Sequence, residues 1–483
     1  MVPIFFSCSD NRKRLILIAG GILVLLVIAG VAVTVFGSQG SDSDSDGDGD
    51  DDDNFDPPSG SADSSAPSSV PSSATDEATG APVKPPLNPK ILICTANPTS
   101  DAAMPSVPDG LCDFLMYRPL SNPFTSASHE ELREFIAITS KLNSTRCGID
   151  IRQEIRKDVI SQFDKHSNTS MAYCPTDDLY VENVQHYSTL DLDFGNATSD
   201  AEVQEFTSLL LKIRMCQERA RGTSDRFGYL FLGVSPLAHN VTDADAALKN
   251  MASHFQRLLD DVKPDAVLFL TTYLRTHLLD PQCSTTGPSL WTRAIMYDQP
   301  TFNDSLNFRN MLKIPPDVVQ LLSLTVHGRW SMYTEKTRPP GGMRNCNETI
   351  IGDILNYTCV NSTDDRYRQY RNADAQDRVD PVRITRVMRS SYTYWEGAYD
   401  SWATMQMKMC KACHDSTHRG GWVVFDLQYA DVHNICNTDF VQGFGYVRRI
   451  KDYMLKPMTE CVINETVDIV ERGIRQEWLL PPS

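Results

Sequence analysis

The most constraining feature of this sequence is an uninterrupted apolar segment near its start. Residues Leu15–Phe36 read LILIAGGILVLLVIAGVAVTVF and contain no charged side chain. At a helical rise of about 1.5 Å per residue, such a run spans the hydrocarbon core of a bilayer. A cleaved secretory signal has a shorter apolar core and ends at a small-residue cleavage site. The segment is therefore predicted to be a transmembrane signal-anchor helix.

Charges on the two sides of this segment predict its orientation. Arg12, Lys13 and Arg14 precede it directly, whereas the residues after it are rich in serine and aspartate. Basic residues favour the cytosolic side of a membrane span. Residues 1–14 are thus expected to form a short cytosolic head. The rest of the chain is expected to be extracellular or in the lumen of the secretory pathway, as in a single-pass type II protein.

Two residue counts agree with an exported ectodomain. Of the 13 cysteines only Cys8 precedes the apolar segment, so an even twelve follow it and can form up to six disulfides. Nine Asn-x-Ser/Thr acceptor sites for N-linked glycans also follow the segment. They are Asn143, Asn168, Asn196, Asn240, Asn303, Asn347, Asn356, Asn361 and Asn464.

Residues 37–89 form a low-complexity segment after the predicted span. They are rich in Ser, Asp, Gly and Pro and nearly free of large apolar residues, so they cannot bury enough surface to fold. We expect a disordered acidic stalk. The whole chain carries a formal net charge of −17 at pH 7 and has no basic stripe, which argues against nucleic acid as a partner.

The remaining residues, 90–483, alternate between strand and helix patterns in the way that is typical of an α/β fold. The clearest unit is a helical pattern of apolar residues from Leu248 to Val262, followed by the apolar strand Ala266–Leu270. Near the end of the chain the pattern repeats as a helix, the strand WVVFDL and a further helix. The two helix faces are marked by Trp402, Met405, Met409 and Ala412, and by Val447, Ile450 and Tyr453.

Common cofactor and catalytic motifs are absent from the sequence. His129-Glu130 is not followed by the second histidine of a zinc-protease helix, because position 133 is arginine. The chain has no P-loop, no Gly-rich dinucleotide fingerprint and no nucleophile elbow. Cys410 and Cys413 have the spacing of half a zinc site, but without a second half they are interpreted as disulfide cysteines. We therefore expect neither a metal nor a cofactor.

Four segments of the chain carry further motifs. They are KILICT at 90–95, GLCDFLMY at 110–117, LLSLTVHGRW at 321–330 and GGWVVFDLQYADVHNIC at 420–436. These segments resemble, in this order, the first, second, sixth and eighth strands of the family-eighteen glycoside hydrolases, the chitinases and chitinase-like lectins. The resemblance implies a degenerate (β/α)8 TIM-type barrel with inserts. It also implies a disulfide between Cys94 and Cys112.

The same resemblance assigns the other strands. It places the third strand at 229–235, the fourth at 265–272, the fifth at 290–296 and the seventh within SYTYWEGAYDSWATMQMK at 391–408. Long stretches then separate the second strand from the third and the sixth from the seventh. We interpret both stretches as surface inserts stapled by their own cysteines, Cys147 and Cys174 in one and Cys346 and Cys359 in the other.

The resemblance further implies that the hydrolytic machinery is lost. In the family, the fourth strand carries Asp-Gly-x-Asp-x-Asp-Trp-Glu. The glutamate protonates the leaving oxygen, and the neighbouring aspartate orients the N-acetyl group of the sugar and balances the developing positive charge. On this alignment Leu268, Leu270 and Thr272 replace the carboxylates, and Thr325 replaces an aspartate of the sixth strand. A threonine hydroxyl is too weak an acid for the role of the glutamate, so we predict a pseudoenzyme.

Two binding functions remain if hydrolysis is lost. A carbohydrate-binding, lectin-like protein would use side chains at the barrel mouth. The candidates are His327, Trp330, Trp395, Phe425 and Tyr429, and ordinary core packing is the alternative for each. A protein–protein interaction ectodomain, a ligand or a receptor, would use the barrel only as a scaffold. An enzyme with unrelated catalytic residues is a third hypothesis.

Overall fold

The computed structural model describes residues 84–97, 104–125, 129–167, 174, 184–194, 198–221, 227–236, 244–272, 287–292, 300–333, 346–352, 376–380, 385–389, 395–415, 418–430 and 444–456. The predicted cytosolic head, the predicted span Leu15–Phe36 and most of the predicted stalk lie outside these ranges. Within these ranges no helix is both long and apolar enough to cross a bilayer.

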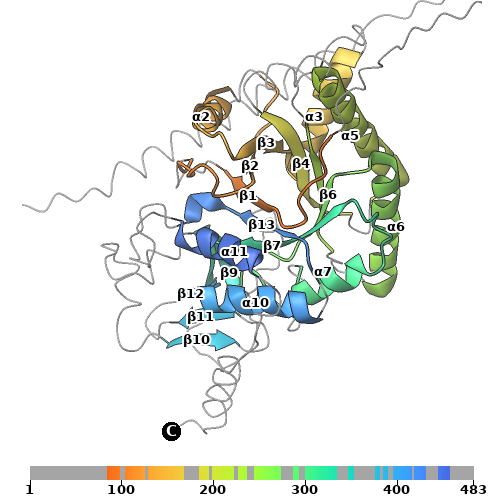
Figure 1. The fold of residues 1–483 in the computed structure, drawn as a ribbon. Coiled ribbons are helices and arrows are strands. Elements are labelled where there is room, and N and C mark those ends of the chain that lie inside the picture. Colours follow the sequence, from red (N-terminus) through yellow and green to blue (C-terminus); the bar gives the residue numbers. More distant parts are fainter. Residues whose placement is uncertain are drawn as a thin grey trace, which may run out of the picture. The chain divides into compact units, whose positions relative to one another are not determined.

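A closed barrel of eight parallel strands forms the centre of the described part of the chain (Figure 1). The strands follow one another around the barrel in chain order, and the last pairs again with the first. They are β1 (Leu92–Ala96), β2 (Phe114–Tyr117), β3 (Arg146–Asp150), β4 (Val184–Leu192), β5 (Leu230–Val234), β6 (Ala266–Phe269), β7 (Val319–Thr325) and β13 (Gly421–Phe425). The predicted α/β class and TIM-type barrel are confirmed.

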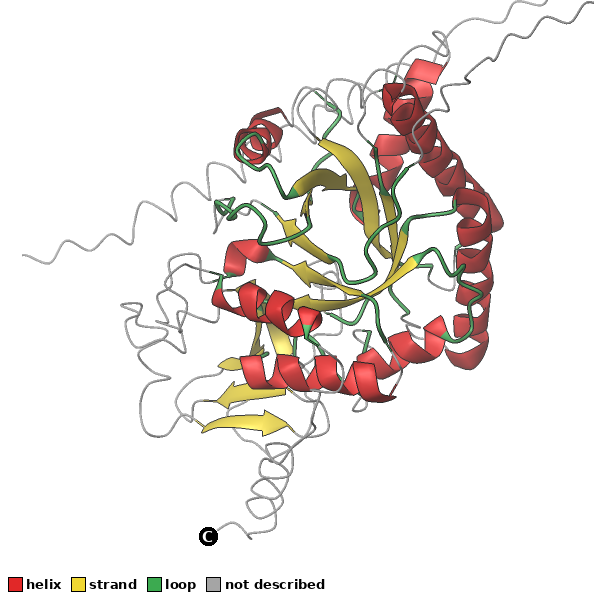
Figure 2. Cartoon of the chain, viewed as in Figure 1, coloured by secondary structure: helices red, strands yellow, loops and turns green. Residues whose placement is uncertain are grey.

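Helices lie on the outside of the strands (Figure 2). They are α2 (His129–Thr139), α3 (Arg156–Ser167), α5 (Asp200–Arg221), α6 (Ala244–Val262), α7 (Phe302–Arg309), α10 (Trp402–Asp415) and α11 (Gly445–Leu455), with short 3-10 helices η2 (Gln153–Ile155) and η5 (Leu427–Tyr429). The three helices predicted from apolar periodicity are α6, α10 and α11. The start of α5 is set by a capping box, in which the side chains of Ser199 and Glu202 each accept a hydrogen bond from the other residue's backbone N–H.

A second sheet, of five antiparallel strands, is inserted between β7 and β13. Its order is β10 (Gln376–Asp380), β11 (Thr385–Arg389), β12 (Trp395–Tyr399), β8 (Gly328–Tyr333) and β9 (Cys346–Gly352). The long insert predicted after the strand at 321–330 therefore exists, but it follows the seventh barrel strand and not the sixth. The segment predicted to contain the seventh strand supplies β12 and α10 instead.

The predicted strand numbers are wrong in the middle of the barrel. β3 and β4 both lie in the stretch that was interpreted as a surface insert, so the segments predicted as third and fourth strands are β5 and β6, the fifth and sixth. Leu268 thus belongs to the sixth strand, and Leu270 directly follows it. In the described part of 290–296 no strand forms, and Leu290 makes only an isolated bridge to Thr301. The physical reason is that β3 and β4 carry polar residues and give no apolar signal.

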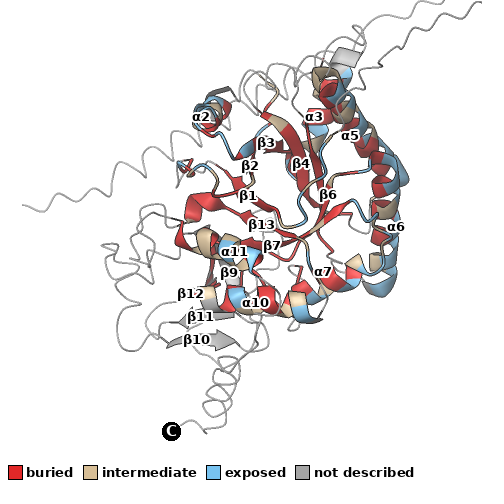
Figure 3. Cartoon of the chain, in the orientation of Figure 1, coloured by how far each residue is buried: buried red, intermediate tan, exposed pale blue. Residues whose placement is uncertain are grey.

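Two apolar clusters stabilise this arrangement. One fills the barrel interior and includes Ile93, Phe114, Phe231, Leu268 and Leu270, none of which is more than 1% exposed. The other lies between the strands and the surrounding helices. Figure 3 shows the result, with buried strands inside and the exposed residues on the outer faces of the helices.

The amino-terminal ends of the strands are covered by residues that were assigned to the stalk. The Lys84 ammonium lies 2.7 Å from a carboxylate oxygen of Asp265, and the Tyr229 hydroxyl donates a hydrogen bond of 2.9 Å to the carbonyl of Pro85. Leu87 packs against the apolar cluster of the barrel interior. The folded part of the chain therefore begins before residue 90, because these residues contact the barrel and Leu87 buries apolar surface against it.

The cysteines only partly follow the expected framework. Cys94 and Cys112 form a disulfide with their Cα atoms 6.0 Å apart, and Cys174 pairs with Cys216 on α5. Cys147, expected to staple an insert, is instead a free thiol buried on β3, and burial raises its pKa to about 12. Cys413, interpreted as a disulfide cysteine, is also free.

Candidate functional site

Polar side chains gather where the barrel strands end, at the face that carries the active site in TIM-type barrels. Arg118 directly follows β2, Asp150 ends β3, Asp191 lies at the end of β4 and Asp426 directly follows β13. None of the four has more than 9% of its surface exposed. We call this group the mouth cluster.

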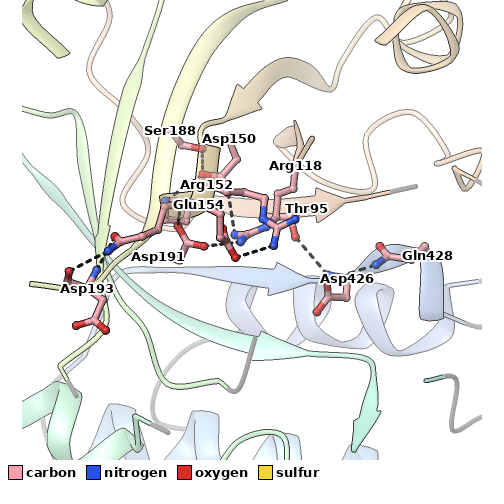
Figure 4. Close-up of polar contacts among 12 residues, drawn as sticks. Thr95, Arg118, Asp150, Arg152, Glu154, Ser188, Asp191, Asp193, Asp426 and Gln428 are labelled. Atoms are coloured by element: carbon pink, nitrogen blue, oxygen red, sulfur yellow. Dashed lines mark hydrogen bonds and ion pairs between the residues drawn. The ribbon is translucent and has the colours of Figure 1, made fainter. Parts of the chain in front are cut away.

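The guanidinium of Arg118 joins two carboxylates of the mouth cluster (Figure 4). Its Nη1 lies 2.7 Å from Oδ2 of Asp150, and its Nη2 donates a hydrogen bond of 2.7 Å to Oδ2 of Asp191. The other oxygen of Asp150 accepts hydrogen bonds from the Ser188 hydroxyl at 2.8 Å and the Leu190 N–H at 3.0 Å. Burying charges is tolerable only when they are paired and hydrogen-bonded, and both conditions are met here.

An irregularity in β4 brings Asp191 into the mouth cluster. The register between β4 and β5 shifts between Thr189 and Leu192, because β4 has one residue more than its neighbour there. Gly233 on β5 lies opposite, and an added Cβ would be 2.2 Å from the Leu190 carbonyl oxygen. Glycine is needed where two backbones approach this closely.

The charges in the mouth cluster shift one another's pKa values. Burial alone would lower the pKa of Arg118, but the carboxylates of Asp150, Asp191 and Asp426 outweigh it and raise that pKa. Burial, together with the nearby Asp191 carboxylate, raises the pKa of Asp150 to about 6, even though Arg118 opposes the shift. The pKa of Asp150 is raised because two buried carboxylates share a single guanidinium.

Stability should depend on pH through Asp150 in a defined direction. Its folded pKa of about 6 lies above the value of about 3.9 in an unfolded chain, so the native state holds the proton more tightly. The resulting stabilisation is fully present below about pH 4 and is lost as the pH rises through about 6. We expect wild type to lose stability relative to Asp150→Asn over this interval, measured by urea unfolding. A constant difference, or one of opposite sign, would contradict the shift.

A second pair in the mouth joins β7 to β13. His327, which follows β7, has its Nδ1 2.7 Å from Oδ2 of Asp426 and 2.6 Å from Oγ1 of Thr325. Burial opposes ionisation of Asp426, but the hydrogen bond and charge of His327 and the charge of Arg118 outweigh it and lower the pKa of this carboxyl. Asp426 has φ of +66°, a strained backbone conformation for a residue other than glycine, and such strain concentrates at functional sites.

The geometry of this pair leaves one histidine nitrogen available. Because Nδ1 faces a carboxylate, it carries a proton, so Nε2 accepts a hydrogen bond when the ring is neutral and donates one when the ring is protonated. Within the described part of the chain, Nε2 of His327 is buried and has no hydrogen-bond partner. A buried ring nitrogen without a partner is suited to a hydrogen bond with a polar group of a ligand, such as a sugar hydroxyl.

Residues after β3 and β4 form the rim of the mouth. The N–H of Gln153 donates to Oδ1 of Asp191 at 3.2 Å, and its side chain bonds to the backbone of Asp193 in both directions at 3.0 and 3.1 Å. Arg152 pairs with Glu154 at 3.0 Å. Figure 4 shows these groups beside the mouth cluster.

The structure brings together three of the five predicted ligand-binding residues. His327 and Tyr429 have their rings 6.4 Å apart, and Phe425 lies under Arg118, whose Cζ is 5.1 Å from the ring centroid. Trp330 and Trp395 lie instead on the neighbouring strands β8 and β12 of the second sheet. Their side chains are outside the described part of the structure.

The other predicted site residues are also distributed over the fold. Thr325 lies in the mouth beside His327, and Thr272 bonds to the Ser323 hydroxyl at 3.1 Å. Asn143 and Asn303 are exposed, as a glycan acceptor requires. The side chains of the remaining seven acceptor asparagines fall outside the description.

Sequence reasoning missed all four residues of the mouth cluster, Arg118, Asp150, Asp191 and Asp426. The available signal was Leu190-Asp-Leu-Asp-Phe194, in which two acidic residues alternate with apolar ones. Acidic residues are rare in buried strands unless they are paired. This segment was instead taken as part of a surface insert.

The architecture defines a closed α/β barrel with a polar mouth, and solved structures place it more closely. No protein-family model and no curated protein matches the sequence. A class V chitinase from Nicotiana tobaccum matches with a TM-score of 0.51 and 13% identity, over 76% of this chain and 99% of that one. Human YKL-39, a pseudo-chitinase with retained chitooligosaccharide binding properties, matches with a TM-score of 0.55 and 11% identity, over 76% of this chain and 99% of that one. The fold is therefore that of the chitinase-like barrels, shared by active and inactive proteins.

Proposed function

We propose that the protein is a glycoprotein whose barrel binds chito-oligosaccharides at its mouth without hydrolysing them. The supporting observation is the buried Nε2 of His327, which has no hydrogen-bond partner in the described part of the chain, in a fold shared with a pseudo-chitinase that binds such sugars.

The end of β4 supports the absence of hydrolysis. With β4 as the fourth strand, the chain reads Ser188-Thr-Leu-Asp191-Leu-Asp193-Phe-Gly195 where the family's pattern is Asp-Gly-x-Asp-x-Asp-Trp-Glu. Two aspartates agree with the pattern, but Gly195 stands in place of the glutamate. Glycine has no group that can protonate a leaving oxygen. The proposed loss therefore falls at Gly195 and not at Leu268, Leu270 and Thr272.

His327→Ala tests the proposed binding site. It removes the buried, unpartnered Nε2, so we expect chito-oligosaccharide affinity to fall at least about tenfold, measured by calorimetry on the purified full-length protein. Asp164→Asn on the exposed side of α3 is the control and should leave affinity unchanged. Unchanged affinity in His327→Ala, with an intact fold, would remove the mouth as the binding site.

We also propose that Leu15–Phe36 anchors the protein in a membrane with residues 1–14 in the cytosol. The basic residues before the segment and the nine glycan acceptor sites after it support this topology. An amino-terminal tag should be detected only after cells are permeabilised, and an endoglycosidase should reduce the apparent mass. A tag that is reachable on intact cells would refute the orientation.

A further inference from the structure

We propose that Arg118 occupies the innermost sugar position of the barrel mouth with its own guanidinium, so that an oligosaccharide is confined to the outer part. The inference rests on the proposed function, because it concerns the same site. It identifies Arg118 as the residue that determines how far a sugar chain enters.

The position of Arg118 across the mouth carries this inference. Its guanidinium contacts Asp150 on β3 and Asp191 on β4 on one side, and the Phe425 ring of β13 on the other. In the barrel, β13 and β4 are separated by β1, β2 and β3. Arg118 follows β2, which lies midway between them, so a guanidinium that contacts both is directed from β2 toward the interior of the mouth. With only 5% of the side chain exposed, it lies inside the mouth and not at its rim.

The chemistry of the same contacts explains why a sugar would be excluded. An aromatic face that stacks on a sugar ring must be accessible, and Phe425 is fully buried with a cation over its ring. The carboxylates that could receive a sugar's hydroxyl or amino groups are already bonded to Arg118. The positively charged guanidinium also neutralises these carboxylates, so they are not free to attract a cationic group of a ligand.

Arg118 is not expected to swing out when a ligand arrives. Its departure would leave two buried carboxylates without a partner, which is strongly unfavourable. Its pKa is raised by its acidic neighbours, so it stays charged at any physiological pH. The block is therefore a permanent property of the folded chain.

The first test compares full-length wild type with Arg118→Ala/Asp150→Asn, a double variant that removes one positive and one negative charge together. Calorimetric titration with chito-oligosaccharides of two to six units should show about tenfold tighter binding by the double variant, because one more sugar can be accommodated. Asp150→Asn alone keeps Arg118 and should show no gain. Equal or weaker binding by a folded double variant overturns the inference.

The second test does not depend on sugar binding. In Arg118→Ala, millimolar methylguanidinium should fill the vacated position and raise the melting temperature saturably, with no such rise in wild type. Absence of this rescue overturns the assignment of a cation position. Because it is measured on Arg118→Ala, this test holds even when the double variant of the first test does not fold. If rescue occurs but neither protein binds any chito-oligosaccharide, the proposed function fails and the cation position stands.

Discussion

Asp400→Ala should destabilise the protein by about 3–5 kcal/mol, because it leaves a buried lysine without its partner. Asp400 follows β12, and its carboxylate forms an ion pair with Lys408 on α10. Both side chains are fully buried. The Lys408 ammonium also donates to the carbonyl and hydroxyl oxygens of Ser289, at 2.7 and 2.8 Å. The pair thus ties the inserted sheet and α10 to the loop between β6 and α7.

Urea unfolding measures the loss, and its pH dependence adds a second criterion. Burial already lowers the pKa of Lys408 against the opposing effect of Asp400, and without Asp400 this lowering should increase. A base with a lowered folded pKa binds fewer protons in the native state, so the variant should regain stability as the pH rises. A loss under about 1 kcal/mol at neutral pH would contradict the importance of the pair.

Two controls separate the lost pair from the lost volume. Asp400→Leu/Lys408→Met removes both charges and should recover much of the stability, since buried pairs can often be replaced by apolar residues at little cost. Asp164→Ala breaks an exposed pair with Lys212 and should cost no more than about 1 kcal/mol.

Gly233→Ala should cost about 3 kcal/mol and should also change the affinity for sugar, since it disturbs the mouth cluster through the backbone. The new Cβ would lie 2.2 Å from the oxygen and 2.5 Å from the carbon of the Leu190 carbonyl. β4 must move to relieve this overlap. Leu190 donates its N–H to Asp150 and is followed by Asp191, so the movement displaces both partners of Arg118.

Gly110→Ala is the matched control for this substitution. Gly110 has φ of +73°, but its nearest neighbour would be 3.9 Å from an added Cβ, so only the left-handed backbone conformation is penalised. We expect a cost of about 1–2 kcal/mol and unchanged sugar affinity. If Gly233→Ala were as stable as wild type and bound sugar normally, the irregularity in β4 would not position the mouth cluster.

The elements with long apolar patterns could be predicted from the sequence. α6 and β6, and α10, β13 and α11 near the end, have apolar residues at the spacing that packing requires. The first two strands and the class of fold were also predictable. The resemblance therefore fixed both ends of the barrel correctly.

The strands that carry the mouth cluster could not be predicted in the same way. On β3 and β4 the barrel interior and mouth receive Asp150, His186 and Ser188 instead of large apolar residues. The polar cluster thus removes the periodicity by which a buried strand is recognised. With two strands missed, every later strand up to the eighth received a wrong number, and the family's catalytic pattern was aligned with β6.

The pairing of charged residues that lie far apart in the chain also could not be predicted from the sequence. Arg118 lies 73 positions from Asp191 in the chain, and only the closed barrel brings their side chains together. The same holds for His327 and Asp426, which are 99 positions apart. His327 was nevertheless predicted as a candidate from the short sequence His327-Gly-Arg-Trp330. This sequence begins after the end of β7 and continues into β8.

The most direct measurement is a titration of purified full-length protein with chitohexaose, followed by mass spectrometry of the recovered sugar. We predict saturable binding that His327→Ala weakens, and chitohexaose recovered intact after prolonged incubation. Release of shorter oligomers would contradict the proposed absence of hydrolysis. Absence of binding at millimolar sugar would contradict the carbohydrate-binding function and favour a protein-interaction ectodomain in its place.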